Sequence, residues 1–205
     1  MLKEYAKNIK EKLKLNSAME MKDIIISVAE NFVGIQELPP NLGFTDKEFE
    51  EAMIEVGWRK RSPWCAWFAE LVWEISYWIK YESDDIQALL VSLFSANSQQ
   101  TYRNFEKSKH FITSQKPRLG AIAVYGWDEV RGHTIAAVTD YTSKEFHTIE
   151  GNQNDRVKKH KRYYTSQLKG FIIPKAFDKK EIPEITKAGI EEIQPPPFDN
   201  DKIIT

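Results

Sequence analysis

The pattern of the sequence changes near Pro117, and this change limits the fold more than any other feature. Before it, apolar residues recur at helical spacing, as in residues 20–36, where Ile24, Val28 and Phe32 mark one face of a helix. After it, short β-branched or aromatic runs alternate with turn residues. These runs predict strands over residues 121–125, 132–140, 146–151, 157–164 and 171–173. A helical first half followed by an antiparallel second half predicts an α+β fold.

The chain of 205 residues favours one main domain, expected over residues 20–177. Residues 1–19 are rich in lysine and are expected to form a charged N-terminal helix or extension. Residues 178–205 are polar and acidic and contain three successive prolines, which predicts a flexible tail. Both ends are either docking segments or, more simply, flexible termini.

Charge and cysteine content exclude several classes of protein. Lys and Arg together number 29 against 30 for Asp and Glu, so the chain has no global basic field and is not expected to bind nucleic acid. The single cysteine excludes an internal disulfide and any cysteine-rich zinc site. No metal and no cofactor are expected.

The N-terminal residues contain no apolar segment of the kind found in secretory signals, since lysines and glutamates interrupt them every few positions. No run is long enough to span a bilayer. We therefore expect synthesis in the cytoplasm without membrane insertion. Action outside the cell would then require a non-classical route of delivery.

Cys65 lies at the start of the strongest helical pattern in the chain. Ser62 suits the N-cap and Pro63 the first helical position, which places Cys65 at N3. Unpaired backbone N–H groups and the positive end of the helix dipole favour a thiolate there and would stabilise an oxyanion. The alternative is a small cysteine buried at a helix start.

A nucleophilic cysteine needs a base, and the chain has four histidines. His110 is expected at the surface, and His160 lies in the charged segment 156–162, which is expected to be a solvated strand face. His133 and His147 both fall in predicted strands. Gly132 permits close backbone approach beside His133, which makes His133 the better candidate.

The strand that contains His133 and the strand over residues 146–151 are expected to form a hairpin. Depending on where the connecting turn is centred, His133 lies opposite Glu150 or opposite Asn152. Either register puts a polar partner on the same face as His133, with His147 on the other face. A carboxylate or amide in that position fixes the tautomer of the imidazole and supports the imidazolium. This order of residues is papain-like.

These residues resemble the CHAP domain (cysteine, histidine-dependent amidohydrolase/peptidase), a branch of the papain-like superfamily related to NlpC-type peptidases. The segments that carry the resemblance are residues 63–68 (PWCAWF), 118–125 (RLGAIAVY), 132–138 (GHTIAAV) and 148–152 (TIEGN). The resemblance implies a papain-like fold, with the nucleophile at a helix N-terminus packed on an antiparallel sheet. It implies a catalytic set of Cys65, His133, Glu150 and Asn152.

The resemblance also implies hydrolysis of an amide bond in peptidoglycan. The enzyme would be an N-acetylmuramoyl-L-alanine amidase or an endopeptidase on stem peptides or cross-bridges. The strand that begins Pro-Gly-Asp in the family begins here at Arg118 as RLGA, without the acidic residue. The chain shows neither the acidic loop of the calcium-binding phage members nor a wall-binding module after residue 175.

Four further residues are predicted to line the substrate groove, namely Trp64, Tyr125, Trp127 and Asp128. Core packing is an equal alternative for Trp64, whereas Trp127 lies in a loop just before His133 and is the better groove candidate. Asp128, like Arg131, would pair with charged groups of a stem peptide, with surface solvation as the alternative.

Two other function classes remain open at the level of sequence. One is a catalytically silent papain-like wall-binding or phage structural module, and the other is an acyl transferase or deamidase of the same fold. A wall hydrolase would act on the cell wall or periplasm, and we expect a monomer. Its delivery partner would be a holin, as for a phage endolysin, or a secretion apparatus, as for an effector with an immunity protein.

Overall fold

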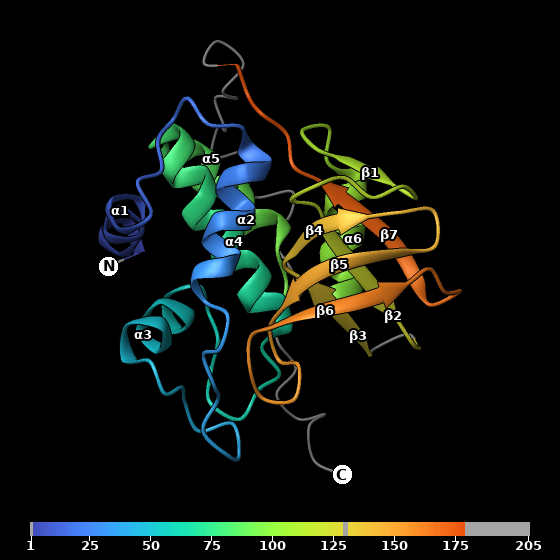
Figure 1. The fold of residues 1–205 in the computed structure, drawn as a ribbon, viewed down its shortest axis with the longest axis horizontal. Coiled ribbons are helices and arrows are strands. Elements are labelled where there is room, and N and C mark those ends of the chain that lie inside the picture. Colours follow the sequence, from blue (N-terminus) through green and yellow to red (C-terminus); the bar gives the residue numbers. More distant parts are fainter. Residues whose placement is uncertain (1, 129–130, 179–205) are drawn as a thin grey trace.

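The computed structural model describes residues 2–128 and 131–178, so the predicted tail lies outside the described residues except for residue 178. Along this part of the chain six helices precede seven strands (Figure 1), which confirms the α+β fold. The helices are α1 (Leu2–Lys12), α2 (Met21–Asn31), α3 (Lys47–Glu55), α4 (Cys65–Tyr81), α5 (Asp84–Leu93) and α6 (Ser98–Lys107). The strands are β1 (Ile112–Ser114), β2 (Ile122–Gly126), β3 (Gly132–Ile135), β4 (Ala137–Tyr141), β5 (Glu145–Glu150), β6 (Lys158–Tyr163) and β7 (Leu168–Ile173).

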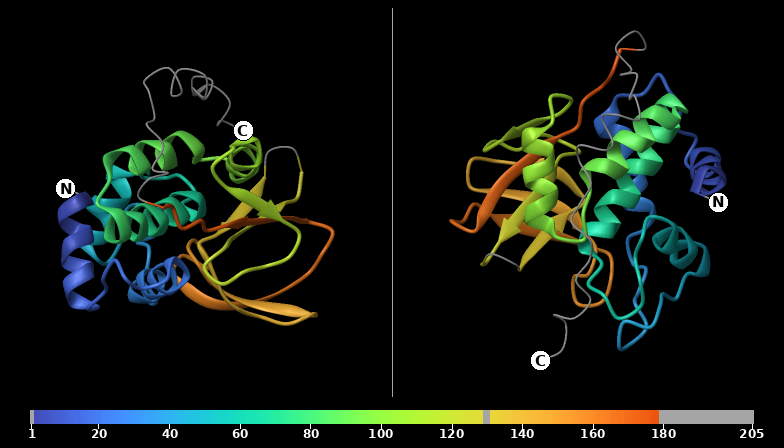
Figure 2. Two further views of the ribbon diagram at one scale, coloured as in Figure 1. Left: turned by 90° about the horizontal axis from the view of Figure 1, so that it is seen from above. Right: turned by 180° about the vertical axis from the view of Figure 1, so that it is seen from behind.

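The strands form two antiparallel sheets, one with the order β1-β7-β2-β3 and one with the order β4-β5-β6. Helices α1 to α5 gather on one side of the molecule and the sheets on the other (Figure 2). Helix α6 packs against the four-stranded sheet. Four of the five predicted strands coincide with β2, β5, β6 and β7, and β1 is an additional strand.

The run predicted as one strand over residues 132–140 is divided between the two sheets. β3 pairs with β2, β4 pairs with β5, and the chain crosses between the sheets at Ala136. The β4–β5 ladder sets Ala137 opposite Ile149 and contains an irregularity after Val138. Both predicted registers for His133 are wrong, because His133 lies in the strand that pairs with β2 rather than with β5.

Helix α4 begins at Cys65 rather than two residues earlier. The carbonyl of Trp64 accepts the N–H of Phe68 at 2.9 Å, which makes Trp64 the N-cap residue. Ser62 instead lies in a turn, where its N–H donates to the carbonyl of Arg59 at 3.2 Å. The predicted N3 position is therefore wrong, and Cys65 occupies N1. Its N–H still belongs to the first turn, whose N–H groups have no partner within the helix.

Helix α1 is part of the packed body. It contacts α3 and α4, and its residues Ala6 and Ile9 are buried in the main hydrophobic core. Residues 2–12 are therefore not a flexible terminus. None of the helices in residues 2–128 and 131–178 has the length and apolar character that crossing a membrane requires.

Candidate active site

Cys65 occupies the N-terminus of α4, where its side chain is almost completely buried, with 7% of the residue exposed. The imidazole of His133, the backbone N–H of Thr134 and the hydroxyl of Ser98 lie beside its sulfur and lower the pKa of its thiol. Ser98 is the first residue of α6, so three separate elements meet at the sulfur. This environment holds a thiolate through directed donors rather than through solvent.

His133 lies at the start of β3, opposite Tyr125 of β2. Its Nε2 is 3.0 Å from Oε2 of Glu150, which leaves Nδ1 for the sulfur of Cys65. Gly132 allows this approach, because a Cβ at that position would lie 2.5 Å from the carbonyl oxygen of Tyr125 and 3.2 Å from Cβ of Ser98. The close approach predicted from this glycine is thus present.

Glu150 ends β5 with its side chain fully buried. Its Oε1 accepts from the hydroxyl of Thr148 at 2.5 Å and from Nε of Arg162 at 2.9 Å. Its Oε2 accepts from Nη2 of Arg162 at 2.5 Å as well as facing His133. The structure therefore answers a question that the sequence left open: Glu150 is the group in contact with the imidazole.

Asn152 lies two residues beyond β5 with a left-handed backbone, at φ +57°. Within the described part of the chain its side chain makes no hydrogen bond, to His133 or to any other group. A catalytic role for Asn152 therefore remains a prediction without a contact to support it.

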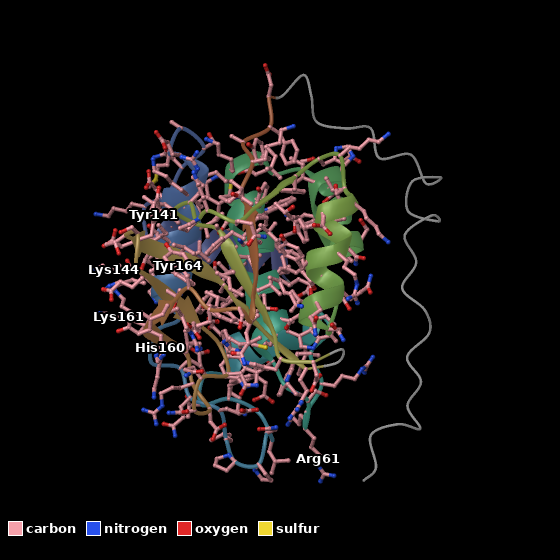
Figure 3. The ribbon with its side chains drawn as sticks, turned by 90° about the vertical axis from the view of Figure 1, so that its right-hand side faces the viewer. Arg61, Tyr141, Lys144, His160, Lys161 and Tyr164 are labelled. Carbon is pink, nitrogen blue, oxygen red and sulfur yellow. The ribbon has the colours of Figure 1, made fainter. Side chains whose placement is uncertain are left out.

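Arg162, like Ser98, is a residue of the site that sequence reasoning missed. It lies in the segment expected to be a solvated strand face, and its neighbours His160 and Lys161 are indeed exposed (Figure 3). Arg162, however, stands opposite the buried Phe146 in the β5–β6 ladder and so points inward. Alternation along the strand does not single out Arg162, because His160 lies on the same face, opposite the buried Thr148, and is nevertheless exposed.

The acidities of the site follow from these contacts. Burial raises the pKa of the Cys65 thiol, but the hydrogen bond and charge of His133 and the other two donors lower it overall. Burial lowers the pKa of His133, but Cys65 and Glu150 outweigh this and raise it to about 9. Burial raises the pKa of Glu150, but Arg162, His133 and Thr148 bring it down to about 2. At neutral pH the site therefore favours a thiolate, an imidazolium and a carboxylate.

The predicted groove residues differ in how far they are buried. Trp64 is fully buried, its indole N–H donates to Oε2 of Glu37 at 2.8 Å, and the prediction that it lines the groove is wrong because no substrate can reach it. Tyr125 is also buried, beneath the guanidinium of Arg162, and its hydroxyl donates to the carbonyl of Tyr163. Trp127 is 49% exposed, so its role in the groove stays a prediction.

Asp128 forms part of the turn that connects β2 to β3. Its carboxylate accepts from the backbone N–H of Arg131 at 2.6 Å and lies 2.5 Å from the guanidinium of the same residue. The side chain of Gln99 donates to the carbonyls of both residues and ties the turn to α6. Asp128 and Arg131 therefore pair with each other, and the prediction that they contact substrate is not tested. The described residues contain no cluster of three His, Cys, Asp or Glu side chains able to hold a metal ion.

Comparison with known proteins gives one match. Residues 57–152 match the family model of the CHAP domain, and this segment contains Cys65, Ser98, His133, Glu150 and Asn152. No curated protein and no solved structure gives a significant match. CHAP domains are papain-like, and a helix-borne cysteine packed against antiparallel strands agrees with that architecture. This match supports the recognition of a CHAP domain over residues 57–152 of the chain.

Proposed function

We propose that this protein is a cysteine amidohydrolase that cleaves an amide bond in peptidoglycan. The CHAP family is one of amidases and peptidases of the peptidoglycan-hydrolase type. The observation that carries the proposal is the buried contact chain from the sulfur of Cys65 through His133 to Glu150, with Nε2 of His133 3.0 Å from Oε2. A domain that only binds the wall has no need for a thiolate held beside an imidazolium.

The reaction uses the groups already in place. The thiolate of Cys65 attacks the carbonyl carbon, a C–S bond forms and the carbonyl oxygen becomes an oxyanion. The backbone N–H of Cys65, unpaired at the first position of α4, supports that oxyanion. His133 gives its proton to the leaving amine as the C–N bond breaks, which leaves a thioester. Water then attacks the thioester, His133 accepts its proton, and the carboxylic acid and the thiolate are released.

Glu150 acts through His133 rather than on the substrate. Its carboxylate holds the ring by Nε2, so that Nδ1 faces the sulfur, and it stabilises the imidazolium. Ser98 and the backbone of Thr134 hold the thiolate before attack. Because all of these groups are buried, the thiolate–imidazolium pair of Cys65 and His133 is formed by contacts within the protein. The pair therefore depends little on salt concentration.

Digestion of purified sacculi tests the proposal. Cys65→Ala and His133→Ala should each reduce the release of new amino groups by about a thousandfold or more, because nucleophile and base act as one unit. His147→Ala is the matched control, since His147 lies on the outward face of β5 and should leave release unchanged. Release by Cys65→Ala at the wild-type rate would exclude Cys65 as the nucleophile.

Two further measurements separate the remaining function classes. Mass spectrometry of the products distinguishes hydrolysis from acyl transfer or deamidation and shows whether the amidase or the endopeptidase bond is cut. Alkylation by iodoacetamide distinguishes an enzyme from a silent module, because a thiolate paired with His133 reacts below the pH at which a free thiol does. A Cys65 no more reactive than a free thiol would favour the binding module.

A further inference from the structure

A cavity of about 280 Å³ lies beside the contact chain of the active site, between β6 and the segment from β2 to Trp127. Arg162 and Tyr125 belong to its wall, so the cavity adjoins the guanidinium that holds Glu150. Figure 3 shows His160 and Lys161, which also line it, on β6 at one edge of the three-stranded sheet, and Tyr141 on β4 at the opposite edge. The cavity is thus a space beside the contact chain from Cys65 through His133 to Glu150, and it opens onto Arg162, which holds Glu150.

The polar groups that line this cavity are mainly donors. Lys161 and Arg162 are cationic, and none of the described lining residues carries a carboxylate. The charge of Lys161 is already shared with Glu145, 3.0 Å away. The side chains of Thr165 and Gln167 make no hydrogen bond within the described part of the chain. A wall of this composition favours an anion that accepts hydrogen bonds.

Arg162 has N–H groups that do not bind Glu150. Its Nε and Nη2 bind Glu150, whereas Nη1 makes no hydrogen bond among the residues of the described chain. The side chain is 24% exposed, which agrees with its place on the cavity wall. A guanidinium presents five N–H groups in a planar fork, and the edge not used by Glu150 matches a second carboxylate.

Two large aromatic side chains border the cavity and are unusually exposed. Trp127 is 49% exposed and Tyr163 is 57% exposed. An aromatic face open to solvent beside a cationic edge is suited to the apolar part of a peptide or to the face of a sugar ring.

We propose that this cavity is a subsite for a carboxylate group of the peptide substrate, bound by the free edge of Arg162 and flanked by Trp127 and Tyr163. The inference rests on the proposed function, because a peptidoglycan stem peptide supplies the carboxylate. It adds a coupling between binding and chemistry. The bound carboxylate shares Arg162 with Glu150, so occupancy weakens the hold of Arg162 on Glu150 and strengthens the charge that Glu150 presents to His133.

Binding to full-length protein carrying Cys65→Ala tests the subsite without turnover. The probes are the tetrapeptide L-Ala–D-Glu–L-Lys–D-Ala with free carboxylates and the same peptide with both carboxylates amidated. Calorimetric titration should show the free acid binding about tenfold tighter, as expected for a hydrogen bond to a charged group. Adding Arg162→Met should abolish this preference, and Arg162→Lys should retain part of it.

Surface variants keep the test independent of folding. Trp127→Ala and Tyr163→Ala should weaken both peptides several-fold, because the aromatic walls contact the part that the peptides share. Tyr141→Ala, at an exposed tyrosine outside this cavity and on the opposite edge strand β4 of the same sheet, should leave the affinity for both peptides unchanged. Equal binding of acid and amide, a preference that survives Arg162→Met, or no binding of either peptide would each overturn the subsite. If acid preference depends on Arg162 but sacculi are not digested, the subsite stands and the proposed hydrolase activity falls.

Discussion

Four charged side chains meet in the buried site, and their charges sum to zero when the thiolate and imidazolium form. Cys65 and Glu150 are the anions, and His133 and Arg162 are the cations. Removing any charge from such a buried set leaves another unpaired, which costs more than an exposed ion pair would contribute. Arg162 therefore allows Glu150 to stay ionised beside His133 without leaving a net negative charge next to the thiolate.

Substitutions of Glu150 and Arg162 should shift the reactive pH window of Cys65, the pH range over which Cys65 is alkylated as a thiolate, in opposite directions. Glu150→Gln removes a negative charge, so the pKa of the thiol and the pKa of the imidazolium should both fall. Since the imidazole also loses its orienting partner, kcat on sacculi should fall by about a hundredfold or more. The measurement is the rate of Cys65 alkylation against pH, alongside digestion. His147→Ala, on the outward face of β5, is the control and should leave both nearly unchanged.

Arg162→Met removes a positive charge, so both pKa values should rise, by about one unit if the loss is near 1.4 kcal/mol. Glu150→Gln combined with Arg162→Met restores a neutral set, and its window should lie close to that of the wild type. A merely structural Arg162 would lower stability without moving the window. An unshifted profile for Arg162→Met would thus contradict the charge balance.

At the scale of the element, α4 carries a second buried pair of carboxyl groups. Glu70 and Glu74 stand one turn apart, are 3% and 4% exposed, and lie close enough to shift each other's pKa. Burial and the neighbouring Glu74 raise the pKa of Glu70. Burial raises the pKa of Glu74 to about 7, with the charge of Glu55 adding to the effect. One oxygen of each carboxyl has no hydrogen-bond partner among the described residues. Such a pair is stable only while it keeps a proton.

The pair should make the free energy of unfolding fall as pH rises. The folded state holds protons that the unfolded state releases near pH 4.5, so the stabilisation is complete below that pH and is lost through about pH 7. Replacing both residues, as Glu70→Gln with Glu74→Gln, should raise the free energy of unfolding more at about pH 8 than at about pH 5, by an amount on the order of 2 kcal/mol, and Tm should rise accordingly. Thermal melts at the two pH values measure this. Glu51→Gln, on the exposed face of α3, is the control; an equal gain at both pH values would count against a titrating pair.

At the scale of the molecule, the site depends on how five elements converge. Cys65 comes from α4, Ser98 from α6, His133 from β3, Glu150 from β5 and Arg162 from β6. The main hydrophobic core joins the helices to both sheets and holds these elements in place. Helix α1 belongs to that core through Ala6 and Ile9, although its sequence is mostly charged.

Truncation of Ile9 should therefore destabilise the whole fold. Ile9 is 3% exposed, and Ile9→Ala should lower the free energy of unfolding by about 3 kcal/mol, as for other large-to-small changes in a core. Urea denaturation followed by circular dichroism measures the change. Ile54→Ala, at a residue that is 50% exposed, should cost less than about 1 kcal/mol. Equal costs for the two variants would show that α1 is not part of the cooperative unit.

The amino-acid sequence by itself determined the α+β order, most of the strands, the helix over residues 20–36 and the place of Cys65 at a helix start, because these depend on local periodicity. It also singled out His133 and narrowed its partner to Glu150 or Asn152, although the strand pairing assumed for His133 was wrong. Only the tertiary structure decided for Glu150, brought Arg162 and Ser98 into the site, and buried Trp64 away from substrate. The reason is physical. A crossing between sheets at Ala136 and an irregular ladder after Val138 set which distant segments meet, and no local pattern encodes them.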